Sequence, residues 1–129
     1  MPITDLVDDT SIPDENPLWR CIPPWHLVQD GQGNYRSSSA AFGDHPDGSP
    51  MSVFVVGAES SIAASLLGHP GFGLVEFSAG LARRLNQGIR RAPLPDHPDH
   101  GEVFGRKTDG VRKGFARNAV WVQLPTLGE

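Results

Sequence analysis

Residues 51–56, MSVFVV, are the segment around which this chain can build a core. The run is apolar, contains β-branched and aromatic side chains, and is bounded by Pro50 and Gly57. A short apolar run with such boundaries is typical of a buried strand. We therefore predict a sheet with this strand at its centre.

Weaker signals on both sides of this run supply the other elements. The sequence QDGQGN at residues 29–34 has the Asp-Gly and glycine content of a hairpin turn. Strands come first along the chain and are then interleaved with helices, which predicts an α+β domain with a mostly antiparallel sheet and about three short helices. The expected strands are 18–22, 51–56, 72–77 and 119–124, and the expected helices are 59–67, 78–87 and 108–118.

The last of these helices has the clearest start. Thr108 occupies the N-cap position, where its hydroxyl can accept a hydrogen bond from an otherwise unpaired backbone N–H. Val111, Phe115 and Ala119 recur at intervals of four residues and give the helix one apolar face. We expect a single core that contains Val53, Val55, Leu74, Phe115 and Trp121.

Length and composition predict one loop-rich domain. A chain of 129 residues with 27 glycines and prolines is long enough for one modest core. Cys21 is the only cysteine, which excludes an intramolecular disulfide and a cysteine zinc site. Residues 1–16 are acidic and lack apolar periodicity, so we expect a mobile arm ahead of a domain over 17–129. No long apolar run is present, so we expect a cytoplasmic protein without membrane contact.

Charge is divided unevenly along the chain. Residues 83–117 hold nine of the eleven Lys and Arg residues and four acids, a net charge of +5, whereas the rest of the chain carries −9. A basic segment of this kind can bind an anion or nucleic acid while the acidic part keeps the protein in solution. Alternatively, the two parts pair with each other in the fold.

The turn before the third helix is the predicted ligand site. Arg106, Lys107 and the Thr108 hydroxyl stand beside the free backbone donors of a helix N-terminus, which together can hold a phosphate. The spacing GxxxxGK[ST] of a phosphate loop is absent, because Arg106 separates Gly105 from Lys107. His100 and Arg20 are the catalytic candidates, and His100 would be an acid or base because the unperturbed pKa of histidine lies near neutrality.

The dipeptide His-Pro occurs three times, at His45, His69 and His97. Because proline with Asp and Gly favours turns, we interpret these segments as turns. A metal site from His45, His97, Asp99 and His100 is the alternative, but no fixed metal-binding spacing supports it, and we predict no metal. Ser37, Ser38 and Ser39 lack a nucleophile motif and are expected in a polar loop.

One resemblance covers residues 18–56. The strand arginine in LWRCI, the segment YRSSSAAF and the strand MSVFVV resemble the start of the RES-type ADP-ribosyltransferase-like toxins. The resemblance implies that Arg20 and the polar cluster hold NAD. The catalytic glutamate of that family has no matching position in this sequence.

These observations leave two main readings of function. The first is a small domain that binds a phosphate-bearing ligand, a nucleotide or nucleic acid, with or without catalysis. The second is a non-catalytic interaction or regulatory module that contacts a protein partner. An ADP-ribosyltransferase-like enzyme that uses NAD is a third reading, and the cofactor is otherwise unassigned.

Overall fold

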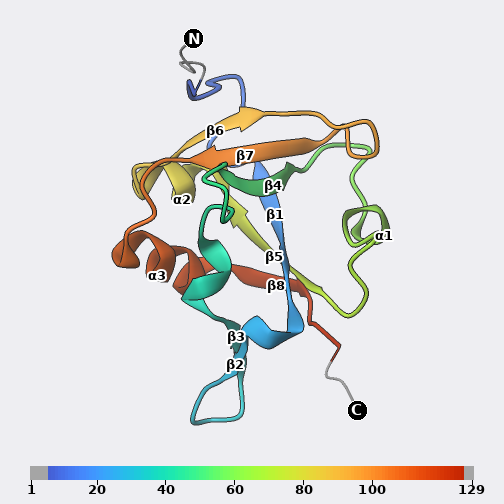
Figure 1. The fold of residues 1–129 in the computed structure, drawn as a ribbon, viewed down its shortest axis with the longest axis vertical. Coiled ribbons are helices and arrows are strands. Elements are labelled where there is room, and N and C mark those ends of the chain that lie inside the picture. Colours follow the sequence, from blue (N-terminus) through green and yellow to red (C-terminus); the bar gives the residue numbers. More distant parts are fainter. Residues whose placement is uncertain (1–5, 127–129) are drawn as a thin grey trace.

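The computed structural model describes residues 6–126 and shows an α+β domain. Its main sheet has six strands in the order β6-β7-β4-β1-β5-β8, and every neighbouring pair is antiparallel. In Figure 1 the strands β6, β7 and β4 form the upper part of the molecule, and a separate hairpin, β2–β3, lies at the lower end. The bounds are β1 Pro17–Ile22, β2 Leu27–Gln29, β3 Tyr35–Ser37, β4 Met51–Val55, β5 Gly73–Ser78, β6 Gly88–Arg91, β7 His100–Phe104 and β8 Val120–Gln123.

The helical elements are short. They are the 3₁₀ turns η1 (Pro24–His26) and η2 (Ser39–Phe42) and the helices α1 (Ile62–Ser65), α2 (Ala79–Arg84) and α3 (Asp109–Asn118). Thr108 caps α3 as predicted, since its hydroxyl accepts from the Val111 N–H at 3.2 Å. α3 packs against η2, and α2 packs against β5 and β6.

Two helices differ from their predicted lengths. We expected residues 59–67 to be helical, but α1 spans only Ile62–Ser65, because the Ser61 hydroxyl accepts from the Ala64 N–H and sets the start there. α2 begins after Ser78 as expected and ends early, with Leu85 as its C-cap. Asn86 then takes a left-handed conformation with φ of 63°, which turns the chain into β6.

One face of the sheet carries the main core. Because side chains alternate along a strand, Met51, Val53 and Val55 of β4 all point to this face. Phe115 of α3 lies over them, with its ring 5.7 Å from that of Phe42 and 4.8 Å from that of Phe77. Val53, Val55 and Phe115 therefore share the predicted core, and Trp121 packs at its edge.

Leu74 is the exception among the predicted core residues. It is fully buried, but it lies outside the main cluster. Its cross-strand partner in β1 is Cys21, which alternates with the core residues Leu18 and Ile22 of the same strand. Alternation therefore places Cys21 and Leu74 on the face of the sheet opposite to the main core. Burial was correctly predicted at this position, and the face was not.

The N-terminal segment packs on the domain instead of extending from it as an arm. Ile12 is fully buried in the core. Arg83 of α2 forms ion pairs with Asp8 at 3.2 Å and Asp14 at 2.6 Å. The expected arm therefore fails for the described part of residues 1–16, and residues 1–5 lie outside the description. The segment is docked because its acids pair with Arg83, a residue far away in the sequence, and local sequence patterns do not reveal such pairing.

The acidic and basic parts of the chain also pair elsewhere. Besides the Arg83 contacts, Arg91 lies 3.6 Å from Asp9, and Lys107 lies 2.9 Å from Asp44. Several acids of the acidic part of the chain are thus paired with bases of the basic part within the fold. Within residues 6–126, no helix has the length and apolar content needed to cross a membrane.

Candidate functional site

A pocket opens where β1 and β4 part. The two strands pair only at Leu18–Val55 and Trp19–Phe54, while β1 continues beside β5 as far as Ile22. Past Trp19 the gap between the strands leads into a cavity of about 590 Å³. Because the sheet is open there, both faces contribute to the lining, with Arg20 and Cys21 from β1 and Ser52, Val53 and Phe54 from β4.

All five histidines of the chain line this pocket. Three of them belong to the His-Pro turns, which come from three separate loops of the fold. The other two come from η1 and from the start of β7. The lining histidines are His26, His45, His69, His97 and His100.

Arg20 is the cation of the pocket. Its Nε donates to the Ala41 carbonyl at 2.9 Å and its Nη1 donates to the Ser52 carbonyl at 2.7 Å. It forms no ion pair with any carboxylate of residues 6–126. Burial lowers the pKa of Arg20 to about 10, opposed in part by Cys21 and Asp44, so the guanidinium stays charged at neutral pH.

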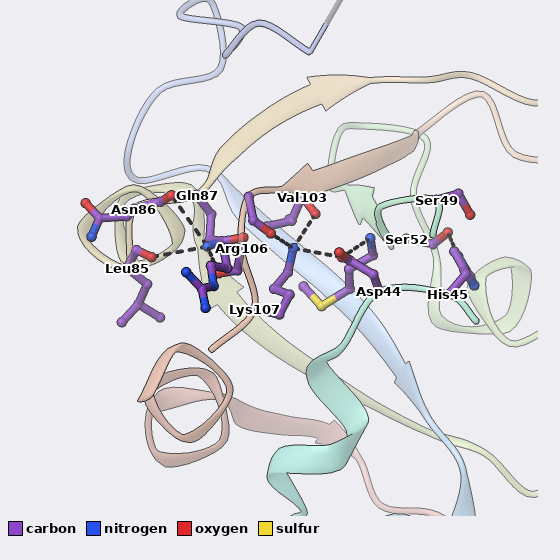
Figure 2. Close-up of polar contacts among 12 residues, drawn as sticks. Asp44, His45, Ser49, Ser52, Leu85, Asn86, Gln87, Val103, Arg106 and Lys107 are labelled. Atoms are coloured by element: carbon purple, nitrogen blue, oxygen red, sulfur yellow. Dashed lines mark hydrogen bonds and ion pairs between the residues drawn. The ribbon is translucent and has the colours of Figure 1, made fainter. Parts of the chain in front are cut away.

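The one carboxylate among the lining residues is already paired. Asp44 accepts from the Nζ of Lys107 at 2.9 Å, and the same Nζ donates to the Val103 and Gly105 carbonyls at 3.0 and 3.1 Å (Figure 2). These three acceptors match the three donors of an ammonium group. Lys107 therefore takes the direct ion pair with Asp44, and Arg20 has no ion pair of its own among residues 6–126.

Two histidines are placed for proton transfer. His45 Nε2 lies 2.9 Å from the Ser52 hydroxyl, a pair that Figure 2 shows beside Asp44. His100 Nδ1 lies 2.8 Å from the Ala92 carbonyl, which can only accept, so Nδ1 carries the hydrogen. The neutral His100 ring then has its lone pair on Nε2 and can act as a base.

Two other lining groups favour their uncharged forms. Burial and the Arg20 charge lower the pKa of His26, and its Nδ1 is buried without a hydrogen-bond partner. Burial raises the pKa of the Cys21 thiol to about 11, and its Sγ donates to the Ser65 carbonyl at 3.4 Å. A thiol with this pKa is almost entirely protonated at neutral pH, which excludes Cys21 as a ready nucleophile.

Aromatic rings complete the walls. The Phe54 ring lies 5.1 Å from that of His97, and the Phe72 ring lies 4.8 Å from that of His69. Trp25 packs edge-on against Phe72 at 5.8 Å and is 73% exposed. Flat apolar walls of this kind suit a planar ring on a ligand.

The predicted site residues divide into two groups. Arg20 and His100 meet in the pocket, whereas Arg106, Lys107 and Thr108 do not line it. Lys107 is engaged by Asp44, the Thr108 hydroxyl caps α3, and the Arg106 carbonyl accepts from Gln87 Nε2 at 3.0 Å. Among these three residues, only the exposed side chain of Arg106 keeps its donors free of described partners.

The alternative metal set does not assemble. In the described part of the chain, no group of three or more His, Cys, Asp or Glu side chains is placed to hold a metal ion. Asp99 instead accepts from the Ser60 hydroxyl at 2.7 Å and does not line the pocket. His45, His97 and His100 share the cavity as separate side chains.

Sequence reasoning missed His26 and Ser52 as pocket residues, and it named His45 only in the alternative metal set. The threefold His-Pro repetition was the available signal, since it marked loops that converge. Comparison with protein-family models, curated proteins and solved structures gives no match for this chain. The chemistry of the pocket is therefore the ground for a functional assignment.

Proposed function

We propose that this protein binds a phosphate-bearing small molecule with a planar ring, of the nucleotide class, in the Arg20 pocket. The observation that carries the proposal is the charged Arg20 guanidinium, which lines the cavity and has no carboxylate partner within residues 6–126. Arg20 is partly buried, and a charge withdrawn from water is costly unless it is paired. An anionic ligand supplies the missing partner.

Phosphate suits this position because of the guanidinium geometry. The Nε and Nη1 of Arg20 each donate a hydrogen bond to a backbone carbonyl, and these two bonds fix the plane of the guanidinium group. Its Nη2 has no hydrogen-bond partner in the described chain. Arginine donors bind phosphate oxygens through short charge-assisted hydrogen bonds. The fixed guanidinium therefore needs little further ordering to receive an anion.

The size and walls of the cavity suit the rest of such a ligand. A volume of about 590 Å³ falls within the range of roughly 300–1,000 Å³ typical of small-molecule sites. Phe54, Phe72 and the neighbouring imidazoles offer faces for a base to stack on. The histidines add ring nitrogens that can donate or accept hydrogen bonds.

The same pocket holds groups for catalysis. When the Ser52 hydroxyl donates to His45 Nε2, the pair has the geometry of a nucleophile and its base. His100 is the second base, through Nε2. In the enzymatic version of this proposal, Arg20 stabilises phosphate charge while one of these histidines moves the proton.

An ADP-ribosyltransferase-like use of NAD is a second candidate. One observation favours it: Arg20, the first-strand arginine of the resemblance, does lie in the pocket. Among residues 6–126 no glutamate lines that pocket, so a base from this part of the chain would be a histidine. NAD is accordingly one of the ligands to test.

Thermal unfolding with a ligand panel tests the proposal. Phosphate, AMP, ATP and NAD are added to wild type, Arg20→Gln and Arg84→Gln, the last removing an exposed charge outside the pocket. A bound ligand raises the melting temperature by mass action. Arg20→Gln should weaken binding roughly 10- to 100-fold, the worth of a charge-assisted hydrogen bond, whereas Arg84→Gln should leave it unchanged.

Arg20→Gln also removes hydrogen bonds to two carbonyls and could disturb the fold. A second variant therefore tests the pocket without changing Arg20. His100→Gln removes a lining side chain and leaves both Arg20 bonds in place, and it too should weaken binding. If no ligand of the panel stabilises wild type at millimolar concentration, the proposal is wrong and the interaction-module reading replaces it. Turnover of bound NAD or ATP, lost in Ser52→Ala or His100→Gln, would identify an enzyme.

A further inference from the structure

A second, smaller hollow lies on the other side of η2. It measures about 250 Å³ and is lined by Arg36 of β3, Ser39 of η2, and Lys113, Ala116 and Arg117 of α3. η2 forms a wall of both cavities, because Ala40 and Ala41 line the Arg20 pocket while Ser39 lines this hollow. The two cavities share no lining residue.

The charge of this hollow is entirely positive. Three of its five lining residues are cations and none is an acid. None of the three cations forms an ion pair with a residue of the described chain, and the one side-chain hydrogen bond of Arg36 there is to the Ser37 carbonyl at 3.3 Å. By contrast, Arg83, Arg90, Arg91, Lys107 and Arg112 all have carboxylate partners.

All three cations are exposed to solvent, and what marks the hollow is that they converge on it from two elements. The helix dipole favours Arg117 in the last turn of α3. However, Lys113 and Arg117 stand four residues apart on one helix, where like charges repel. Arg36 adds a third positive charge from a different element. An anion in the hollow would convert this repulsion into attraction.

We propose that this hollow is a second anion site, which takes a phosphate group independently of the Arg20 pocket. Two arginines provide planar forks for phosphate oxygens, and Lys113 and the Ser39 hydroxyl add donors. The volume lies below the range of small-molecule pockets, so the hollow accepts one or two phosphate groups and not a whole nucleotide. The phosphate can be a free inorganic ion or part of a polynucleotide backbone.

Titration followed by amide NMR tests the site directly. Inorganic pyrophosphate and a short single-stranded oligonucleotide are added separately to ¹⁵N-labelled wild type at low salt. The amides of Ser39, Lys113 and Arg117 should shift and saturate with at least one probe. Saturation by pyrophosphate identifies the free ion as sufficient, and saturation by the oligonucleotide alone identifies a backbone phosphate.

Matched variants separate this site from general charge attraction. Arg117→Gln and Arg84→Gln each remove one exposed arginine from the last turn of a helix, but only Arg117 lines the hollow. Arg117→Gln should raise the dissociation constant of the bound probe at least about tenfold, whereas Arg84→Gln should leave it unchanged. Because both side chains are exposed and glutamine is a good helix former, neither variant should unfold.

The Arg20→Gln variant separates this site from the Arg20 pocket. The shifts of Ser39 and Arg117 should persist in that protein, whatever the fate of nucleotide binding. Amide shifts that never saturate, or an equal loss in Arg84→Gln and Arg117→Gln, would overturn the second site and leave the Arg20 pocket unaffected.

Discussion

At the residue scale, two partly buried cations, Lys107 and Arg20, differ in how their charges are paired. Lys107 satisfies all three of its donors on Asp44 and two carbonyls. Arg20 bonds two carbonyls and has no described carboxylate partner. Lys107 thus has all its partners within the fold, whereas Arg20 has no direct ion pair among residues 6–126. For this reason we propose the site at Arg20, rather than at the predicted residues before α3.

His26 should make stability depend on pH. Burial and the Arg20 charge lower its pKa in the folded protein, while the unfolded chain takes up this proton near pH 6.5. Below that pH the unfolded state binds more protons, so the free energy of unfolding should fall as pH decreases through 6.5 and stop falling below the lowered pKa. Urea unfolding between pH 7.5 and 5 measures this contribution.

The matched variants are His26→Phe and His69→Phe. The first removes the partly buried titrating ring, so it should lose less stability on acidification than wild type. The second changes an exposed histidine and keeps the His26 contribution. Equal pH dependence in wild type and His26→Phe would contradict the assignment.

At the element scale, α3 depends on packing more than on its own sequence. Gly110 and Gly114 within it each cost about 1 kcal/mol relative to alanine. An added Cβ at Gly114 would lie 2.7 Å from a Leu85 methyl group, so the Leu85 side chain would have to move. The Thr108 cap and the Phe115 ring hold the helix in place.

Phe115→Ala should therefore be strongly destabilising. The side chain is fully buried between Phe42 and Phe77, and truncation of such a ring costs roughly 3–5 kcal/mol. Chemical denaturation gives the free energy of unfolding. Lys113→Ala, on the exposed side of the same helix, should change it by less than about 0.5 kcal/mol; a similarly small effect for Phe115 would show that the helix face is assigned incorrectly.

At the scale of the whole molecule, long-range ion pairs tie the acidic N-terminal segment to the basic part of the chain. Asp8 and Asp14 both bind Arg83, and the Asp9 N–H donates to the Ile89 carbonyl at 2.8 Å. These contacts bring Ile12 into the core beside α2 and β6. The segment thus helps to close the domain.

Ile12→Ala tests whether this docking contributes to stability. A fully buried isoleucine should cost about 2–5 kcal/mol on truncation to alanine. Val7→Ala, at a side chain that is 68% exposed, should have almost no effect on unfolding by urea. Deletion of residues 1–16 should lower the melting temperature markedly; an unchanged melting temperature would show a free arm, as the sequence alone suggested.

The sequence by itself determined the local features of this protein. Residues 51–56 as a central strand, the turn at 29–34 and the Thr108 cap all follow from patterns within a few neighbouring residues, and each is present in the fold. Alternation and capping are short-range effects, so they can be read without a partner strand. The same locality explains the correct α+β class.

Only the tertiary structure decided where chemistry could occur. His26, His45, His69, His97 and His100 are scattered along the chain and meet because β1 and β4 part after Trp19. Lys107 was predicted to bind the ligand, but in the fold its ammonium group pairs with Asp44. Leu74 was predicted in the main core, but its pairing with Cys21 places it on the opposite face of the sheet. A side chain's partners depend on which distant strands and loops come together, and local sequence patterns do not predict those long-range contacts.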